Sequence, residues 1–139
     1  MLQNELDMSF NYQPVLYGEF KTTHEQGASG KISDAVKQMR ENESVGDAMF
    51  RLYKKRSAIT HRVAKANKVF PTQTGGRWDM WTESGGHPSI EDMVTAQTFP
   101  LDFDFDGGYT KVIYICGMSV PPIMIKRIVT RLIESGVFK

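Results

Sequence analysis

The chain has 139 residues, a formal net charge of +1 and one cysteine. A chain of this length fits one domain and buries about two thirds of the surface that it exposes when unfolded. One cysteine excludes an intramolecular disulfide, and without a signal-peptide core or an apolar run near ~20 residues the sequence predicts a cytoplasmic, soluble chain with no membrane span.

Charge is unevenly divided along the sequence, although its sum is close to zero. Residues 1–47 carry four bases and eight acids, and residues 79–139 carry five bases and eight acids. Residues 48–78 contain eight bases and no acid. The middle of the sequence is therefore a basic block inside a nearly neutral protein.

The N-terminal part of the chain predicts short elements. Residues 1–14 are polar with little periodicity, and we expect them to form an irregular lead-in. Residues 15–21 suit a short strand. A short helix is predicted over residues 34–40, with the Ser33 side chain as its N-terminal cap.

A long helix is predicted over residues 45–66. Ser44 and Asp47 resemble a capping box at its start. At 3.6 residues per turn, five apolar side chains fall on one stripe, namely Met49, Leu52, Ile59, Val63 and Ala66. The opposite side would carry five basic side chains, namely Arg51, Lys54, Lys55, Arg62 and Lys65. Arg56 falls near the apolar edge. This basic face is predicted to follow the phosphate backbone of double-stranded DNA, and a solvated helix face is the alternative.

Residues 71–86 are rich in glycine, threonine and proline and predict a loop or a short hairpin. Within this stretch Gln73 and Arg77 carry the side chains that bind adenine and guanine, and glycines allow a backbone to approach a ligand closely. Base recognition is one interpretation of the loop. The other is an ordinary surface loop whose tryptophans pack onto the core.

The last third predicts a helix over residues 92–97, a turn at Gly107 and Gly108, and a strand over residues 109–115. Cys116 ends this apolar run, and we expect its thiol to be buried with a raised pKa. A terminal helix over residues 121–135 opens at two prolines and ends at a glycine. Its apolar face holds Ile125, Ile128, Val129, Leu132 and Ile133. Together the elements predict a small α+β domain with a long basic helix, short strands and a C-terminal helix.

The sequence contains no complete metal-binding motif. Asp102, Asp104 and Asp106 imitate the start of a calcium-binding loop, but Ile113 stands where such a loop needs a bidentate glutamate. The three histidines are far apart in the sequence and have no partner at metal-ligand spacing.

Two signatures resemble the ninth and tenth conserved blocks of DNA (cytosine-5) methyltransferases. The ninth block is matched at Ser89, Asp92, Gln97, Phe99, Pro100, Phe103 and Phe105. The tenth is matched at Gly117, Ser119, Val120, Pro121 and Pro122. Glu91 stands where the family has arginine, and Met118 where it has asparagine. By this resemblance residues 87–139 hold the last two blocks, and residues 15–86 hold the connector and the DNA-recognition region of a single domain.

The resemblance implies that Gly117, Met118, Ser119 and Val120 help to wall the pocket of the methyl donor, S-adenosyl-L-methionine. The family's catalytic Pro-Cys dipeptide and its Phe-x-Gly-x-Gly cofactor loop occur nowhere in the 139 residues. Catalytic residues are therefore expected on a second polypeptide. Met1, just before the connector, is compatible with an enzyme that is naturally split there.

Three functions follow as hypotheses. The first is a recognition and cofactor-pocket-completing part of a cytosine-5 methyltransferase, which binds double-stranded DNA and a catalytic polypeptide, or associates with itself through the terminal helix. The second is a non-catalytic DNA-binding or regulatory protein derived from that family, for which Glu91 and Met118 argue. Residues 34–40 and 45–66 would then suit a helix-turn-helix. The third is an interaction module that modulates another methyltransferase.

Overall fold

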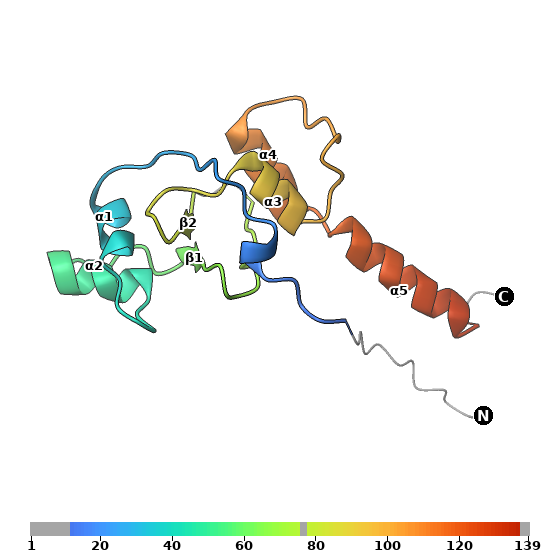
Figure 1. Cartoon of the computed structure of the whole chain (residues 1–139), viewed down its shortest axis with the longest axis horizontal. Helices are drawn as coiled ribbons and strands as arrows, with labels where there is room; N and C mark the ends of the chain where they lie inside the picture. Colours follow the sequence, from blue (N-terminus) through green and yellow to red (C-terminus); the bar gives the residue numbers. More distant parts are fainter. Residues whose placement is uncertain (1–11, 76–77, 137–139) are drawn as a thin grey trace.

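The computed structural model describes residues 12–75 and 78–136. The elements in chain order are the 3-10 helix η1 (Tyr17–Glu19), helices α1 (Lys31–Lys37) and α2 (Val45–Tyr53), strands β1 (Arg62–Ala64) and β2 (Met80–Thr82), and helices α3 (Ile90–Ala96), α4 (Tyr109–Met118) and α5 (Pro122–Glu134). The fold is a small mixed α+β domain, as predicted. Figure 1 shows α1 and α2 at one end of the molecule and α5 extending from the other end.

The sheet consists of β1 and β2, which run parallel with Val63 opposite Trp81. All three residues of β2 are buried, so this short strand lies inside the domain. Two isolated bridges join the N-terminal segment to later parts of the chain, from Leu16 to Val69 and from Gln26 to His87. Because β2 pairs with β1, residues 71–86 do not form the hairpin that the sequence allowed.

The core is divided among small clusters of buried side chains. Ala35 of α1 packs against Ala48 and Met49 of α2. A second cluster places Trp81 of β2 beneath the same two helices, against Val36 and Val45. A third joins the C-terminal elements, and it contains Val94, Phe105, Val112 and Cys116. The domain therefore has a helical end built on α1 and α2 and a second end built on α3 and α4.

The long helix predicted over residues 45–66 is wrong. It begins as expected, because Ser44 Oγ accepts a hydrogen bond from Asp47 N at 3.1 Å. It ends at Tyr53, and Lys54 follows in the left-handed conformation with φ 54°. Val63, expected on the apolar stripe of the helix, instead pairs with Trp81 in the sheet. A β-branched residue fits a half-buried strand well, so tertiary pairing prevailed over the helical pattern.

Both strands predicted at residues 15–21 and 109–115 are also wrong. The first is replaced by η1, which Glu19 stabilises by accepting a hydrogen bond from Leu16 N at 2.7 Å. The second is replaced by α4, which buries Val112, Ile113 and Cys116. These positions suit one face of a helix as well as an apolar strand, so periodicity alone did not distinguish the two.

The helix predicted over residues 34–40 forms three residues earlier, as α1. Ser33 is not its cap, because Gly30 holds that position. Ser33 is a residue of α1, and its side chain is buried. Its hydroxyl donates a hydrogen bond to Gly85 O at 2.7 Å. This contact ties α1 to the turn after β2.

Local signals located α3 and α5 well. Ser89 and Asp92 form a capping box at the start of α3, two residues before the predicted start of the helix. Pro122 is the first residue of α5, and Gly136 lies beyond its end with φ 71°. Cys116 is buried as expected, and burial raises the pKa of its thiol to about 11.

The expectation that the chain lacks an apolar run near ~20 residues needs correction. Residues 109–134 are long and apolar enough, by length and composition alone, to cross a membrane. The helix is interrupted at Ser119, however, whose φ of −91° and ψ of 156° are extended. The two parts, α4 and α5, are 10 and 13 residues long, and each is shorter than a span of about 20 residues.

Candidate partner and DNA interfaces

The ninth-block and tenth-block signatures lie side by side. Gln97 Nε2, at the end of α3, donates hydrogen bonds to Cys116 O at 2.5 Å and to Ser119 O at 3.0 Å. Ile123 N, in the first turn of α5, donates to Thr98 Oγ1 at 3.1 Å. These partners are 19 to 25 positions apart in the sequence. The matched glutamine therefore holds the end of α4 against the end of α3.

An apolar groove of about 550 Å³ lies between the two proline-bearing segments. Its lining includes Phe99, Pro100, Leu101, Pro122, Ile123 and Lys126. Leu101 is 71% exposed, although it is a large apolar side chain. The groove thus opens where the ninth block meets the start of α5.

The phenylalanines of the ninth block support this groove from inside. The rings of Phe99, Phe103 and Phe105 contact one another with centroids 4.9 to 5.3 Å apart. Phe105 belongs to the buried cluster with Val112 and Cys116 of α4. Alternating aromatic residues in this signature therefore have a packing role, with Phe105 buried and Phe103 half exposed.

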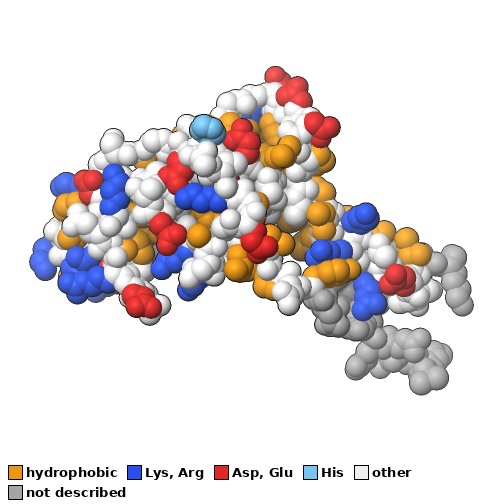
Figure 2. All heavy atoms as spheres, viewed as in Figure 1, with side chains coloured by type: hydrophobic (Ala, Val, Ile, Leu, Met, Phe, Trp, Pro, Cys, Tyr) orange, Lys and Arg blue, Asp and Glu red, His pale blue; other side chains and the backbone are white. Residues whose placement is uncertain are grey.

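The apolar face of α5 is partly exposed. No residue of this helix is buried. On its apolar face Ile125, Val129 and Ile133 are between 43% and 59% exposed, whereas Ile128 and Leu132 are half-buried. Ile123 and Met124, both 45% exposed, lie on other sides of the helix. Figure 2 shows hydrophobic side chains next to lysine and arginine along this projecting helix. An amphipathic helix whose apolar side faces water is typical of a surface that binds another protein.

Gly117 lies in backbone contact with the loop before β2. A Cβ atom at Gly117 would lie 2.2 Å from Gly75 N and 2.3 Å from the Thr74 carbonyl carbon. The Met118 side chain lies along the same loop, since a Cβ at Gly75 would be 2.8 Å from Met118 Cγ. The last turn of α4 therefore crosses residues 74–75 at Gly117, where the close approach of the two backbones leaves no room for a Cβ atom.

The four predicted cofactor-binding residues thus have different surroundings. Gly117 contacts the loop, and Ser119 Oγ donates a hydrogen bond to Cys116 O at 3.0 Å. Met118 and Val120 are 66% and 50% exposed, next to the start of α5. Only these last two present side chains to an incoming partner, and the role of all four at a methyl donor stays a prediction.

The five basic residues predicted for one helix face are dispersed. Arg51 of α2 is engaged by Glu43, with Nε to Oε1 at 2.7 Å and Nη2 to Oε2 at 2.9 Å. This pairing lowers the pKa of the Glu43 carboxyl to about 2. Lys54 and Lys55 follow α2, whereas Arg62 and Lys65 lie in and after β1. A continuous basic helix face does not exist, and Arg51 is largely neutralised.

Gln73 does not present its amide to a ligand in this structure. The side chain is 7% exposed, and its Nε2 donates a hydrogen bond to Met93 O at 2.8 Å. Arg77, the other predicted base-reading residue, lies outside the described residues. Of the loop's tryptophans, Trp81 is buried and Trp78 is 45% exposed, so the packing interpretation holds for Trp81.

Sequence reasoning gave no role to Phe50 or Arg56. Phe50 is 46% exposed on α2, and the Arg56 guanidinium lies over its ring, 5.4 Å from the centroid. Lys54 Nζ lies 5.9 Å from the same centroid. The usable signal was an aromatic residue inside the acid-free stretch. We did not use this signal, because the predicted helix placed Arg56 near its apolar edge and away from the other basic side chains.

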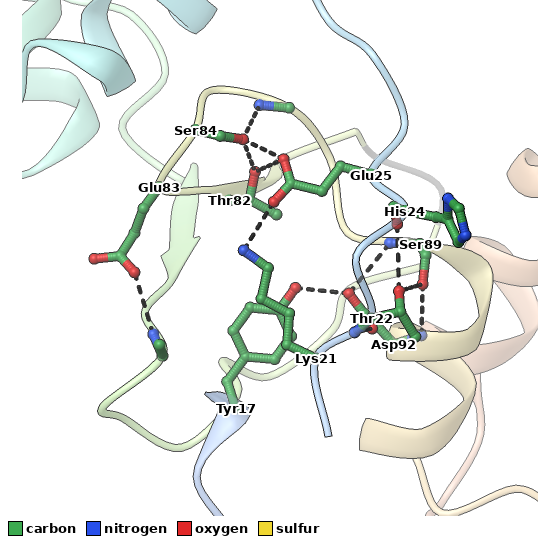
Figure 3. A network of polar contacts seen from close by, with 12 residues as sticks. Tyr17, Lys21, Thr22, His24, Glu25, Thr82, Glu83, Ser84, Ser89 and Asp92 are labelled. Carbon is green, nitrogen blue, oxygen red and sulfur yellow. Dashed lines mark hydrogen bonds and ion pairs between the residues drawn. The ribbon is translucent and has the colours of Figure 1, made fainter. Parts of the chain in front are cut away.

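A buried polar network positions α3 relative to the N-terminal segment (Figure 3). Asp92, which is fully buried, accepts hydrogen bonds from Tyr17 OH and from Thr22 N, both at 2.7 Å. Nearby, Glu25 pairs with Lys21 at 2.9 Å and accepts from Thr82 Oγ1 at 2.8 Å. The matched acid of the ninth block is therefore a structural acceptor that fixes residues 17–25 to α3.

Alkaline pH is expected to destabilise the domain through two tyrosines. Burial raises the pKa of Tyr17, and its hydrogen bond to Asp92 raises it further, while burial also raises the pKa of Tyr109. Below about pH 10 both tyrosines are protonated in the folded and unfolded states. Above it the unfolded chain releases two protons that the folded chain keeps, so stability falls by up to about 1.4 kcal/mol per pH unit for each tyrosine.

Urea unfolding at a series of pH values above about 9 measures this loss. Lysines also titrate in the range, so the comparison is with a Tyr17→Phe, Tyr109→Phe variant, whose stability should fall less steeply. Equal slopes for the two proteins would show that the tyrosines are not responsible.

Comparisons with protein families, with characterised proteins and with solved structures find no match for this chain. The resemblance to cytosine-5 methyltransferases therefore rests on the residues of the two signatures alone and stays a prediction.

Proposed function

We propose that this chain is the DNA-recognition and cofactor-pocket-completing part of a DNA (cytosine-5) methyltransferase, with the catalytic residues on a separate polypeptide. One observation carries the proposal. The two signatures, distant in sequence, are joined by Gln97 and share a groove with α5. Two parts of one functional region are expected to lie together in this way.

The chemistry of the reaction supports a second polypeptide. Methylation at cytosine C5 requires a nucleophilic thiolate and a base flipped out of the duplex into a closed pocket. Cys116 is fully buried among apolar side chains, and burial raises the pKa of its thiol to about 11. A thiol that is protonated near neutral pH and inaccessible to DNA is a core residue, so the reacting sulfur must come from elsewhere.

The catalytic polypeptide is proposed to dock on α5 and on the adjoining apolar groove. Covering the part of Ile125 or Val129 that is still exposed contributes about 1 kcal/mol each, so several such side chains on one helix face supply substantial affinity. Met118 and Val120 lie at the start of this surface. In the assembled enzyme they would contact S-adenosyl-L-methionine held by the other chain.

A regulatory protein derived from the same family is the second candidate, and one observation favours it. Met118 replaces the usual asparagine and packs along Gly75, so the residue has a structural role that needs no cofactor. Such a protein would keep the fold and its DNA contacts without completing a donor pocket.

Binding of S-adenosyl-L-methionine separates the two candidates. Isothermal titration of the methyl donor into the catalytic polypeptide should show weak binding, and addition of an equimolar amount of this chain should strengthen it. Donor affinity that is the same with and without the chain would contradict the proposed function and favour the regulator.

A further inference from the structure

Basic and apolar side chains meet at the end of α2 that lies farthest from α5 (Figures 1 and 2). We call this the basic tip, and it consists of Phe50, Lys54, Lys55, Arg56 and Ile59. The three basic residues are exposed, and Ile59 is 73% exposed. A hollow of about 230 Å³ lies between Phe50, Arg56 and Ile59 and the first turn of α2.

The positive charge of the basic tip is largely uncompensated. Lys54, Lys55 and Arg56 form no ion pair with another residue in ranges 12–75 and 78–136. The acid beside the hollow is Asp47, which lines it from α2 and accepts a hydrogen bond from Ser44 Oγ at 2.6 Å. Glu43, the next acid along the chain, is bound to Arg51. The basic tip therefore holds three cations, and Asp47 is the one acid that lines its hollow.

Local structure restricts two of these cations. Lys54 and Arg56 hold their charged groups 5.9 and 5.4 Å from the centroid of the Phe50 ring. Lys54 is also the left-handed residue that ends α2, so the backbone turns sharply between the helix and Arg56. Cation–π contacts reduce the side-chain entropy that would otherwise be lost on binding an anion.

We propose that the basic tip binds the phosphate backbone of duplex DNA without regard to base sequence. Lysine and arginine side chains neutralise phosphates and release counterions, which makes such binding salt-dependent. An anionic membrane is disfavoured, because the exposed apolar side chains of the basic tip are only Phe50 and Ile59, which is little surface for insertion. The biological role rests on the proposed function, in which this contact adds an attachment away from the α5 interface.

The test uses the full chain alone, without a catalytic polypeptide or methyl donor, so that its result is independent of the proposed function. Fluorescence anisotropy measures binding to two 20-base-pair duplexes of unrelated sequence over a range of salt concentrations. The tip variant is Lys54→Gln, Lys55→Gln, Arg56→Gln. The matched control, Lys68→Gln, Lys111→Gln, Arg127→Gln, removes the same charge from exposed positions outside the basic tip.

We expect the wild type to bind both duplexes with affinities within about twofold. The tip variant should bind roughly tenfold more weakly, with a log–log salt slope smaller by about 2 to 3. A third variant, Phe50→Leu, keeps an apolar side chain but removes the ring, and should weaken binding by a few fold. The control variant should bind like the wild type.

Three results would overturn the proposal. They are an unchanged salt slope in the tip variant, an equal loss of affinity in the control variant, and binding of the chain to anionic phosphatidylserine vesicles but not to duplex DNA. Thermal unfolding of each variant confirms that the exposed substitutions leave the fold intact.

Discussion

Replacing Gly117 with alanine is expected to lower the free energy of unfolding by about 3 kcal/mol or more. The added Cβ would lie 2.2 Å from Gly75 N, and its other near neighbours are also backbone atoms of residues 74 and 75. Backbone cannot rotate away as a flexible side chain can, so α4 and the loop would have to separate. Urea unfolding, followed by circular dichroism, measures the change.

Gly108→Ala is the matched control, because Gly108 caps the same helix. A Cβ there meets no atom within 4 Å, and the φ of −80° suits any residue. We expect a loss of about 1 kcal/mol, since alanine is a poorer N-cap residue than glycine but meets no steric obstacle here. If Gly117→Ala were no more costly than Gly108→Ala, the contact between α4 and residues 74–75 would not exist in solution.

Replacing Ile125 with aspartate should weaken association with the catalytic polypeptide on the order of 100-fold, or about 3 kcal/mol. The side chain is 45% exposed in the chain alone, so the charge remains hydrated there and stability should hardly change. In the complex the same charge would be buried against an apolar surface without a partner. Sedimentation of mixtures at several concentrations gives the dissociation constant.

Thr130→Asp provides the control on the same helix. Thr130 is exposed and lies about 140° around the helix from Ile125, at 100° per residue. The added charge is the same, but it faces water in both states, so association should be retained. Equal weakening by both substitutions would point to a general charge effect, and no weakening by either would remove α5 from the interface.

Signals confined to a few neighbouring residues predicted the structure well. The cap of α2 was recognised from side chains that bond within one turn, whereas the Ser89–Asp92 box that opens α3 was not predicted. The proline pair at 121–122 marked the start of α5 because proline lacks the donor that a first turn leaves unused. The burial of Cys116 followed from its apolar neighbours.

Errors arose where distant parts of the chain decide the outcome. No sequence signal near Tyr53 indicates that the helix ends there. The interaction that competes with a longer helix is the pairing of Val63 with Trp81, which is distant in sequence. Val112, Ile113 and Cys116 suited either a strand or a helix, and contact with α3 and Phe105 selected the helix. Periodicity cannot distinguish these cases without knowledge of the partner surface.

The same distinction between local and distant signals applies to the candidate interfaces. The exposed apolar face of α5 was expected from its sequence pattern together with the missing blocks, and three of its five side chains, Ile125, Val129 and Ile133, are exposed. The basic face was lost with the long helix, and Arg51 was neutralised by an acid eight residues earlier. The crossing of Gly117 and Gly75 joins positions 42 residues apart, and no local pattern indicates it.

Methyl transfer tests the central claim most directly. Tritium transfer from labelled S-adenosyl-L-methionine to duplex DNA would be measured for the chain alone, for a polypeptide that carries the Pro-Cys dipeptide and the cofactor loop, and for an equimolar mixture. The mixture should methylate cytosine, and neither component alone should do so at a comparable rate. Transfer by the chain alone, or a mixture no more active than the catalytic polypeptide, would contradict the division of labour proposed for the two chains.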